Sequence, residues 1–195
     1  MLDLVLGGAR SGKSAFAQQL AASARAQVIY VGTAQATDEE MAARIARHQA
    51  DRPEGWRTVE CGDRLDPALL YAADRETVLI DGLGAWLGGT LPVLARLAGV
   101  NLATATTIAP AAAAAIEAPI RDAVQRLSAW AGERRGRVIV VSEETGWGIV
   151  PASPLSRLFR DVLGRANQHL AAAADHVYLV VAGIPVDLKR LAAEL

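Results

Sequence analysis

The sequence is poor in cysteine and carries almost no net charge. Its one cysteine, Cys61, cannot form an internal disulfide, which fits a reducing compartment and predicts a cytoplasmic protein. The 20 basic and 21 acidic residues give a formal net charge of −1, so the chain as a whole does not attract nucleic acid or a membrane surface. This balance favours a small-molecule ligand, and any basic site must be local.

The sequence also lacks a segment suited to targeting or to membrane insertion. Leu2, Asp3 and Leu4 lead directly into a glycine-rich stretch, so we expect no signal peptide. Residues 97–116 carry no charge over a length that a bilayer would require, but the run contains threonines and Pro110, and most of its apolar residues are alanines. We therefore expect no membrane span and interpret the run, including the segment 103–115, as an alanine-rich connection or a mobile helix.

A phosphate-binding loop near the start is the strongest motif that the sequence does contain. The residues Gly7-Gly8-Ala9-Arg10-Ser11-Gly12-Lys13-Ser14 fit the spacing G-x-x-x-x-G-K-[ST] and stand between an apolar run, Leu2 to Leu6, and a stretch with helical spacing. In such a loop, backbone N–H groups bind phosphates, Lys13 reaches the β and γ phosphates, and the Ser14 hydroxyl ligates Mg²⁺. The alternative is a glycine turn that binds nothing.

Short apolar runs rich in β-branched residues recur along the chain, with helical stretches between them. This alternation is typical of a parallel α/β sheet. With 195 residues, no internal repeat and no linker, the chain is expected to form one domain over residues 1–195. Besides the first apolar run, the expected strands are Val28–Val31, Arg57–Glu60, Val78–Asp81, Val138–Ser142 and Val177–Ala182.

Capping residues mark the start of two expected helices. Thr37 and Glu40 have the spacing of a capping box, which opens a helix that runs toward Gln49. Ser153 followed by Pro154 predicts the start of a long helix that reaches Ala174. The exposed face of this second helix is expected to be basic, with Arg157, Arg160 and Arg165.

Asp81 is the second candidate metal ligand, beside Ser14. The run Val78-Leu79-Ile80-Asp81 indicates a buried strand that ends in a carboxylate. In enzymes with a phosphate-binding loop, an acid in this place holds Mg²⁺ or its bound water. An apolar run that ends in aspartate is also common where a strand meets a turn, so a purely structural role is the alternative.

His48 lies on the first of the two expected helices, at helical spacing from Met41 and Ile45. It can therefore be a half-buried histidine on the packing face of that helix. A neutral imidazole can instead act as a nucleophile at phosphorus or as a base. Three nearby arginines can hold nucleotide phosphates or form a solvated basic face, and these are Arg44, Arg47 and Arg52.

The segment from Ser142 to Pro151 follows an expected buried strand, which places it at the carboxyl edge of the sheet. Ligands bind at this edge in open α/β folds. The glycines and proline of the segment shape a loop, and Glu143 and Glu144 bring negative charge beside the expected phosphate site. The alternative is an ordinary connection between a strand and a helix.

Together, these segments resemble the bifunctional adenosylcobinamide kinase / adenosylcobinamide-phosphate guanylyltransferase family of cobalamin biosynthesis. The resemblance covers nearly the whole chain and includes the late strand Val177 to Ala182. Besides the phosphate-binding loop, its markers are Asp38-Glu39-Glu40-Met41, Arg44-Ile45, His48, Arg52-Pro53, Trp56-Arg57-Thr58, Glu60, Glu144, Gly146-Trp147-Gly148-Ile149-Val150-Pro151, Phe159-Arg160-Asp161 and Gly164-Arg165-Ala166-Asn167-Gln168.

The resemblance implies a P-loop NTPase with a RecA-like, mainly parallel sheet flanked by helices, a homotrimer, and two reactions that use Mg²⁺. The first phosphorylates the aminopropanol hydroxyl of adenosylcobinamide with ATP or GTP. The second transfers GMP from GTP onto that phosphate and releases pyrophosphate, with a guanylylated histidine, here His48, as the intermediate. The implied nucleotide contacts are the phosphate-binding loop, Gly32, Thr33, Ala34, Gln49, Ala50, Asp51, Arg52, Glu60 and Asp81.

Both implied reactions depend on positioning and electrostatic stabilisation, which the loop amides, Ser14 and the catalytic candidate Lys13 supply. Glu60 has the acceptor chemistry to bind the guanine N1 and exocyclic amine. One loop can hardly present the γ-phosphate for kinase transfer and the α-phosphate to His48 in a single pose. We therefore expect two placements of the nucleotide.

The sequence departs from the family at the expected mouth of the site. After Asp81 the family usually has Cys-Leu-Thr and later Asn, whereas this chain reads Gly82-Leu83-Gly84 and later Gly89, and Glu143 stands where asparagine is usual. These changes leave the metal geometry and the kinase step undecided. The sequence also does not identify the phosphate donor of the kinase step or the way in which the corrinoid docks. The alternatives are a P-loop kinase for another small alcohol, with His48 merely packed, and a nucleotide-binding regulatory protein without turnover.

Overall fold

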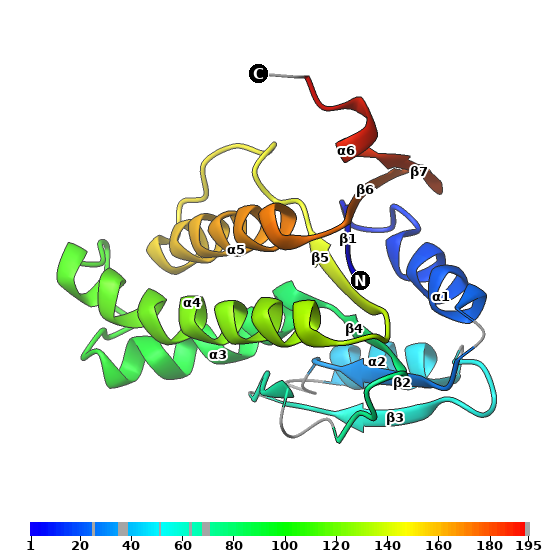
Figure 1. Ribbon diagram of the computed structural model, residues 1–195. Coiled ribbons are helices and arrows are strands. Elements are labelled where there is room, and N and C mark those ends of the chain that lie inside the picture. The colour runs from blue at the N-terminus through cyan, green and yellow to red at the C-terminus, as the bar shows by residue number, and fades with distance from the viewer. Residues whose placement is uncertain (25, 35–38, 51, 63, 68–70, 194–195) are drawn as a thin grey trace.

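The chain folds around one seven-stranded sheet, as the computed structural model shows for residues 1–24, 26–34, 39–50, 52–62, 64–67 and 71–193 (Figure 1). The strands are β1 (Leu2–Gly7), β2 (Val28–Gly32), β3 (Arg57–Glu60), β4 (Thr77–Asp81), β5 (Val138–Glu143), β6 (His176–Val181) and β7 (Ile184–Asp187). Their order is β3-β2-β4-β5-β1-β6-β7; β1 to β6 run in parallel and β7 pairs antiparallel with β6. The expected α/β fold class is confirmed.

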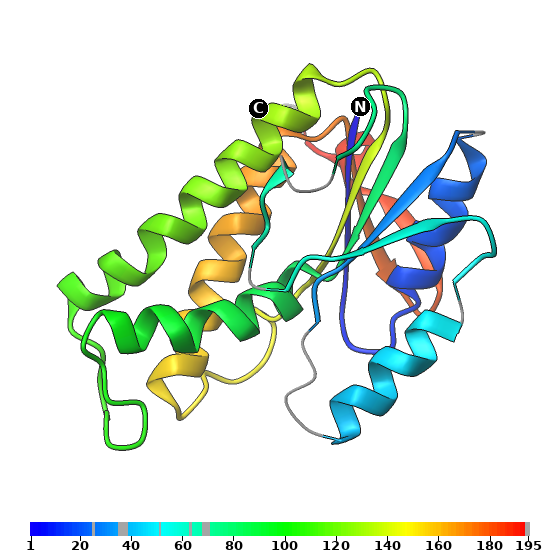
Figure 2. The ribbon, with the colours of Figure 1, turned by 90° about the horizontal axis from the view of Figure 1, so that it is seen from below.

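Helices cover both faces of this sheet. They are α1 (Lys13–Ser23), α2 (Glu39–Ala50), α3 (Leu83–Leu97), α4 (Pro110–Glu133), α5 (Pro154–Ala173) and the short α6 (Leu188–Leu191). The view from below shows α3, α4 and α5 on one side of the strands and α1 on the other (Figure 2). The long helices thus form one layer, and the helix that follows the phosphate-binding loop belongs to the opposite layer.

The central strands alternate their side chains between two apolar cores. Leu4 of β1 and Ile80 of β4 are fully buried in the larger core, under α3, α4 and α5. Val5 and Leu79, the neighbours of these residues, are fully buried in the smaller core with residues of α1. Because both faces are covered, the central strands are mostly apolar, and this is why they could be predicted from the sequence.

Both expected helices form, with different outcomes for their caps. Ser153 precedes α5, and its hydroxyl accepts a hydrogen bond from the Ser156 N–H at 3.4 Å, which confirms the predicted cap. The helix that carries His48 is α2, but Thr37 of the proposed capping box lies outside the described residues.

The expected basic face of α5 needs correction, because its arginines are not simply exposed to solvent. Arg157 and Arg160 are half-buried, and Arg157 donates to the carbonyl oxygens of Pro151 and Ala152 at 2.9 and 2.6 Å. Arg165 makes a bidentate pair with Glu117 of α4, at 2.6 and 2.8 Å. The guanidinium groups of Arg157 and Arg165 thus hold neighbouring segments to α5.

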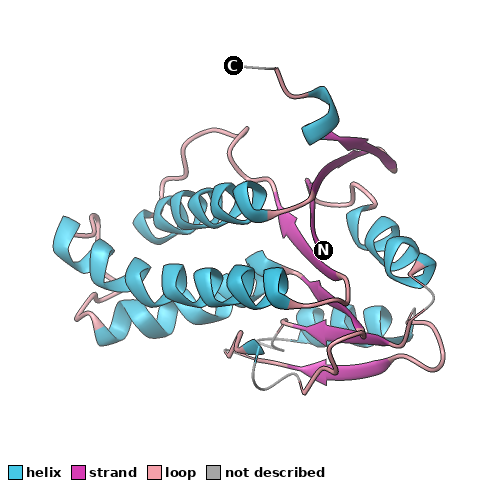
Figure 3. Cartoon of the chain, in the orientation of Figure 1, coloured by secondary structure: helices cyan, strands magenta, loops and turns pink. Residues whose placement is uncertain are grey.

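The charge-free run of residues 97–116 is divided between two helices and their connection. Leu97 is the last residue of α3, residues 98–109 connect, and Pro110 begins α4 as its first helical residue (Figure 3). Ile116 is fully buried, so the alanine-rich end of α4 is anchored in the larger core. Among the described residues, no helix is both long enough and apolar enough to cross a bilayer.

Candidate active site

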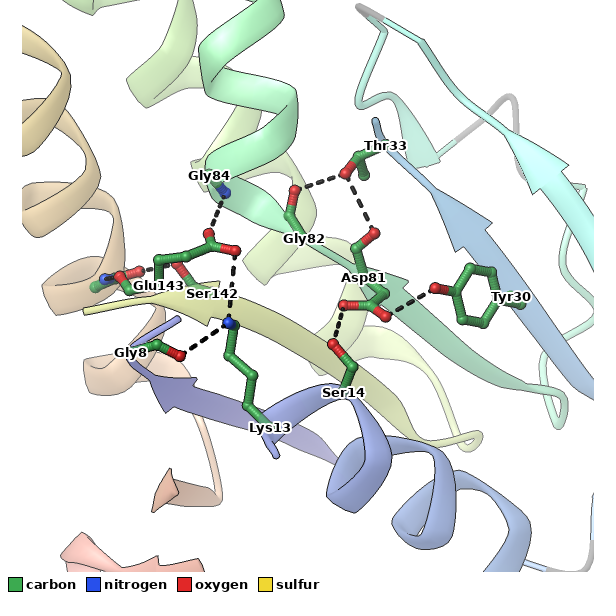
Figure 4. Close-up of polar contacts among 11 residues, drawn as sticks. Gly8, Lys13, Ser14, Tyr30, Thr33, Asp81, Gly82, Gly84, Ser142 and Glu143 are labelled. Carbon is green, nitrogen blue, oxygen red and sulfur yellow. Dashed lines mark hydrogen bonds and ion pairs between the residues drawn. The ribbon is translucent and has the colours of Figure 1, made fainter. Parts of the chain in front are cut away.

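The carboxyl ends of β1, β2, β4 and β5 meet at one edge of the sheet, since these strands are parallel. A cleft of about 350 Å³ opens there. Figure 4 shows the polar residues at or just after the ends of these strands, among them Gly8, Thr33, Asp81 and Glu143. Its lining residues are Ala9, Lys13, Ser14, Tyr30, Gly32, Thr33, Ala34, Ile45, Arg52, Glu60, Asp81, Gly82, Ala85 and Glu143.

The phosphate-binding loop turns sharply into α1 at the floor of this cleft. Gly12 precedes the first helical residue with a φ of 92°, a left-handed conformation that is strained for any other residue. The Gly183 N–H donates to the Ser11 carbonyl at 2.8 Å, so the turn between β6 and β7 holds the loop. Lys13 Nζ donates to the Gly8 carbonyl at 3.3 Å (Figure 4). The lysine is thus folded back over the loop that would bind the phosphates.

Ser14 and Asp81, the two candidate metal ligands, lie together in the cleft. The Ser14 hydroxyl donates to Asp81 Oδ1 at 3.0 Å, and the Tyr30 hydroxyl donates to Asp81 Oδ2 at 2.7 Å. Burial raises the pKa of Tyr30 far above its ordinary range, and the negative charge of Asp81 adds to the rise. Tyr30 therefore stays protonated and keeps the carboxylate oriented toward Ser14.

The donors at this position fit Mg²⁺, which prefers oxygen ligands and usually keeps several of its waters. Ser14 offers a hydroxyl and Asp81 a carboxylate, so both candidate ligand atoms are oxygens. Within the described part of the chain, no group of three or more histidine, cysteine, aspartate or glutamate side chains is arranged to hold a metal. A hydroxyl and a carboxylate suit an ion that arrives with a nucleotide and shares its phosphate oxygens.

A second polar group lies on the β2 and β3 side of the cleft. The Arg52 guanidinium lies over the Tyr30 ring, 4.0 Å from its centroid, and Arg52 Nη1 is 3.0 Å from Glu60 Oε1. Gln49 Nε2 donates to the same Glu60 oxygen at 3.1 Å. A Cβ atom on Gly32 would overlap Glu60 Oε2, so this carboxylate lies directly against the glycine. The structure thus brings together four of the residues expected to contact a nucleotide.

Thr33 joins the ends of β2 and β4. Its side chain is fully buried, and its hydroxyl donates to the Gly82 carbonyl at 2.6 Å. Ala34 lines the cleft beside it. Both expected nucleotide-contact residues therefore lie at the cleft, where Thr33 shapes the backbone next to Asp81.

The structure describes some of the other candidate residues only in part. His48 belongs to α2, between Ile45, which lines the cleft, and Gln49; the side chains of His48 and Ala50 and the whole of Asp51 lie outside the described residues. In the phosphate-binding loop, Arg10 is exposed with a φ of 56°. The role of His48 therefore stays a prediction.

Sequence patterns do not single out Tyr30, which they place only within an apolar strand. Its role depends on the pairing of β2 with β4, which aligns Tyr30 with Leu79 and Gly32 with Asp81. Arg52 over the ring adds a second contact that sequence spacing does not reveal. An aromatic hydroxyl in a strand next to the Asp81 strand is the only signal available, and it is weak without the strand order.

The fold and the sequence were compared with known proteins. A solved ATPase from the type III secretion system of pathogenic bacteria is similar with a TM-score of 0.51 over 99% of this chain and 58% of its own. The chain thus spans less than two thirds of that ATPase. At 12% identity, the likeness shows a shared fold alone.

The sequence relatives are much more similar and cover nearly the full length. The bifunctional adenosylcobalamin biosynthesis proteins CobU of Salmonella typhimurium and of Escherichia coli are 43% and 42% identical over 97% of this chain and 100% of their own. CobP of Pseudomonas aeruginosa, a protein of the same description, is 40% identical over 97% of this chain and 98% of its own. The sequence model of cobinamide kinase / cobinamide phosphate guanyltransferase matches residues 3–188. The resemblance is confirmed, and the chain belongs to this family of enzymes.

Proposed function

We propose that the protein phosphorylates adenosylcobinamide with ATP or GTP, then transfers GMP from GTP to adenosylcobinamide phosphate through guanylylated His48. One observation carries the proposal: the phosphate-binding loop, Asp81 and the Arg52–Glu60 pair line a single cleft, beside the helix that carries His48. The phosphate-binding loop would bind the triphosphate, and the Arg52–Glu60 pair would bind the base. The printed descriptions of the family and its relatives supply the substrate class.

In the kinase step, the residues of the loop bind and orient the donor. Backbone N–H groups and the N-terminus of α1 hold the β and γ phosphates, and Lys13 leaves the Gly8 carbonyl to contact them. Mg²⁺ bound with the triphosphate, near Ser14 and Asp81, supplies neutralisation of phosphate charge. Tyr30 holds the Asp81 carboxylate in place throughout. Most of the catalysis is then positioning and electrostatic stabilisation.

In the guanylyl transfer, a neutral ring nitrogen of His48 attacks the α-phosphorus of GTP. A phosphorus–nitrogen bond forms, the bond to the bridging oxygen breaks, and pyrophosphate leaves with the electron pair. A phosphate oxygen of adenosylcobinamide phosphate then attacks the same phosphorus and releases the imidazole. Each of these two displacements has a lower barrier than direct transfer of GMP from GTP to the acceptor. Lys13 and the loop amides stabilise the pyrophosphate that leaves.

Glu60 is the proposed reader of guanine. Its Oε1 accepts hydrogen bonds from Arg52 and Gln49, and its side chain is 45% exposed, so the carboxylate is held but still open to a ligand. Carboxylate oxygens accept from the guanine N1–H and exocyclic amine, whereas adenine has no donor at N1. Ile45 of α2, the helix that carries His48, lines the same cleft as Glu60.

We also propose two nucleotide placements, because one loop can hardly present the γ-phosphate and the α-phosphate in a single pose. We further propose a homotrimer, which the family resemblance implies, in the cytoplasm, which the single cysteine favours. Exposed apolar side chains on the β6–β7 hairpin and on the loop before α5 are compatible with burial between subunits, among them Ile184 at 66% and Ile149 at 96%. Structures with kinase and guanylyl-transfer analogues test the first point, and a single identical triphosphate pose contradicts it. Light scattering tests the second, with an expected mass of three chains.

The test of the proposed function follows both products in one reaction. The protein is incubated with adenosylcobinamide, ATP, GTP and Mg²⁺, and we expect adenosylcobinamide phosphate first, then one pyrophosphate for each adenosylcobinamide-GDP. Phosphorylation of another small alcohol instead of the corrinoid supports a different P-loop kinase. Slow hydrolysis without acceptor-dependent pyrophosphate supports a regulatory nucleotide-binding protein. Either result contradicts the proposal.

A further inference from the structure

Glu143 is the carboxylate of the cleft that lies beside the phosphate-binding lysine. It is the last residue of β5, the strand between the Asp81 strand and the loop strand, and its Oε1 is 3.8 Å from Lys13 Nζ. Figure 4 shows its side chain pointing into the space between Lys13 and the start of α3. Asp81, by contrast, has one donor on each oxygen, from Ser14 and Tyr30. Glu143 is therefore placed beside the lysine that would contact the terminal phosphate of a donor.

Two separate contacts fix the position of Glu143. Its Oε2 accepts a hydrogen bond from the Gly84 N–H at 3.0 Å, and its backbone carbonyl accepts one from Asn167 Nδ2 at 3.0 Å. Asn167 is itself held by the buried Ser142 hydroxyl, 2.7 Å from its Oδ1. Within the described residues, Oε1 has the Lys13 ion pair as its contact, and the side chain keeps 31% of its surface exposed. One oxygen is thus anchored and the other faces the cleft.

Gly84 makes this position possible. A Cβ atom at residue 84 would overlap Glu143 Oε2, so any larger side chain there displaces the carboxylate. Gly84 and Glu143 are 59 residues apart in sequence. They meet only in the folded chain, where the smaller residue accommodates the charged one.

We infer that Glu143 is a catalytic residue of the kinase step: its Oε1 accepts the proton of the alcohol that receives the phosphate. As the alcohol oxygen bonds to the γ-phosphorus, its proton moves to Glu143, and the bond to the bridging oxygen breaks with the electron pair leaving on the nucleoside diphosphate. The partly exposed side chain then returns the proton to water. A carboxylate that orients and deprotonates a hydroxyl nucleophile is a recurring part of such transfers. The inference rests on the proposed function.

The test separates the two reactions in a set of matched variants. Glu143→Gln keeps the shape of the side chain but cannot take the proton, and Gly84→Ala keeps the carboxylate but displaces it. Asp122→Asn is the control, since it removes an exposed carboxylate of α4 that lies 3.8 Å from Arg121. For each variant we measure the unfolding temperature, kcat and KM for ATP-dependent phosphorylation of adenosylcobinamide, and self-labelling by GTP.

We expect Glu143→Gln to lower kcat for phosphorylation about 100-fold, and Gly84→Ala about tenfold, with KM for ATP and GTP labelling within about threefold of the parent. The control keeps both activities. Phosphorylation by folded Glu143→Gln within about threefold of the parent overturns the inference, and so does an equal loss of phosphorylation and labelling. If the parent phosphorylates no adenosylcobinamide, the proposed function fails first and this inference with it.

Discussion

Tyr30 donates its hydroxyl proton to Asp81 Oδ2 at 2.7 Å, and so fixes the carboxylate that faces the Ser14 hydroxyl. The tyrosine is buried, and its ring lies under the Arg52 guanidinium at 4.0 Å. One side chain thereby connects the proposed metal ligand with the arginine that pairs with Glu60. The two halves of the cleft are therefore coupled through Tyr30.

Replacement of Tyr30 by phenylalanine tests this coupling. The variant removes the Tyr30 donor from Asp81, so we expect the half-saturating Mg²⁺ concentration for phosphorylation to rise about tenfold, as outer partners of metal ligands commonly affect metal affinity. A magnesium titration of the initial rate measures it. Tyr178→Phe, on β6 and edge-on to Phe16, is the control. An unchanged magnesium dependence in Tyr30→Phe contradicts the role.

The raised pKa of Tyr30 predicts a loss of stability in alkali. In the unfolded chain the phenol ionises near its ordinary pKa of about 10, whereas burial keeps it protonated in the folded protein. The stabilising contribution is thus complete below pH about 10 and decreases as the pH rises above it, because only the unfolded state loses the proton. Unfolding temperatures between neutral and strongly alkaline pH should fall less steeply in Tyr30→Phe. Parallel curves for both proteins would falsify the prediction.

Glu60→Gln tests the reading of guanine. The amide keeps the size of the side chain but brings an N–H₂ donor toward the guanine donors, so we expect the preference for GTP over ATP in self-guanylylation to drop about tenfold or more. Competition between labelled GTP and unlabelled ATP measures the ratio. The control is Glu54→Gln, an exposed residue before β3. If the ratio stays that of the parent, Glu60 does not read the base.

Arg134 is expected to be a structural residue, distant from the chemistry. It caps α4, and its guanidinium donates to the carbonyl oxygens of Ala72, Ala73 and Glu76 while lying over the Trp130 ring. Lysine cannot satisfy three carbonyls with the same planar group, so Arg134→Lys should lower the free energy of unfolding by about 2 kcal/mol. Denaturant unfolding measures it.

The neighbouring Arg135 provides a matched control for that measurement. Its side chain is 73% exposed and its ion pair with Asp74 spans 3.7 Å, so Arg135→Lys should change the free energy of unfolding by less than about 0.5 kcal/mol. Equal effects of the two substitutions would show that burial and geometry at Arg134 do not matter. GTP labelling should be unchanged in both variants.

The sequence predicts the central sheet well because its strands are buried on both faces. Leu4 and Ile80 belong to short apolar runs, a pattern that is typical of strands buried on both faces of a parallel sheet. The antiparallel strand β7 is not predicted, since it is short, contains Pro185 and is largely exposed. The alanine-rich start of α4 is uncertain for a different reason: alanine fits a helix and a connection alike, and burial of Ile116 decides between them.

Sequence motifs predict only those residues of the site that belong to local patterns. Lys13, Ser14 and Asp81 follow from local patterns at the ends of strands, and the structure brings them into one cleft. The contact between Gly84 and Glu143 depends on β5 lying next to β4, which no local pattern gives. Long-range partners of this kind appear only once the strand order is known.

The central claim is that His48 carries the guanylyl group, and GTP labelled at the α-phosphate tests it most directly. In the presence of Mg²⁺, the protein should take up label that is lost in acid and stable in alkali, as expected of a phosphorus–nitrogen bond. His48→Ala should abolish this labelling, whereas His169→Ala, whose ring lies 2.9 Å from the Ser128 hydroxyl, should retain it. Label that persists in folded His48→Ala, or is stable in acid, would contradict the account.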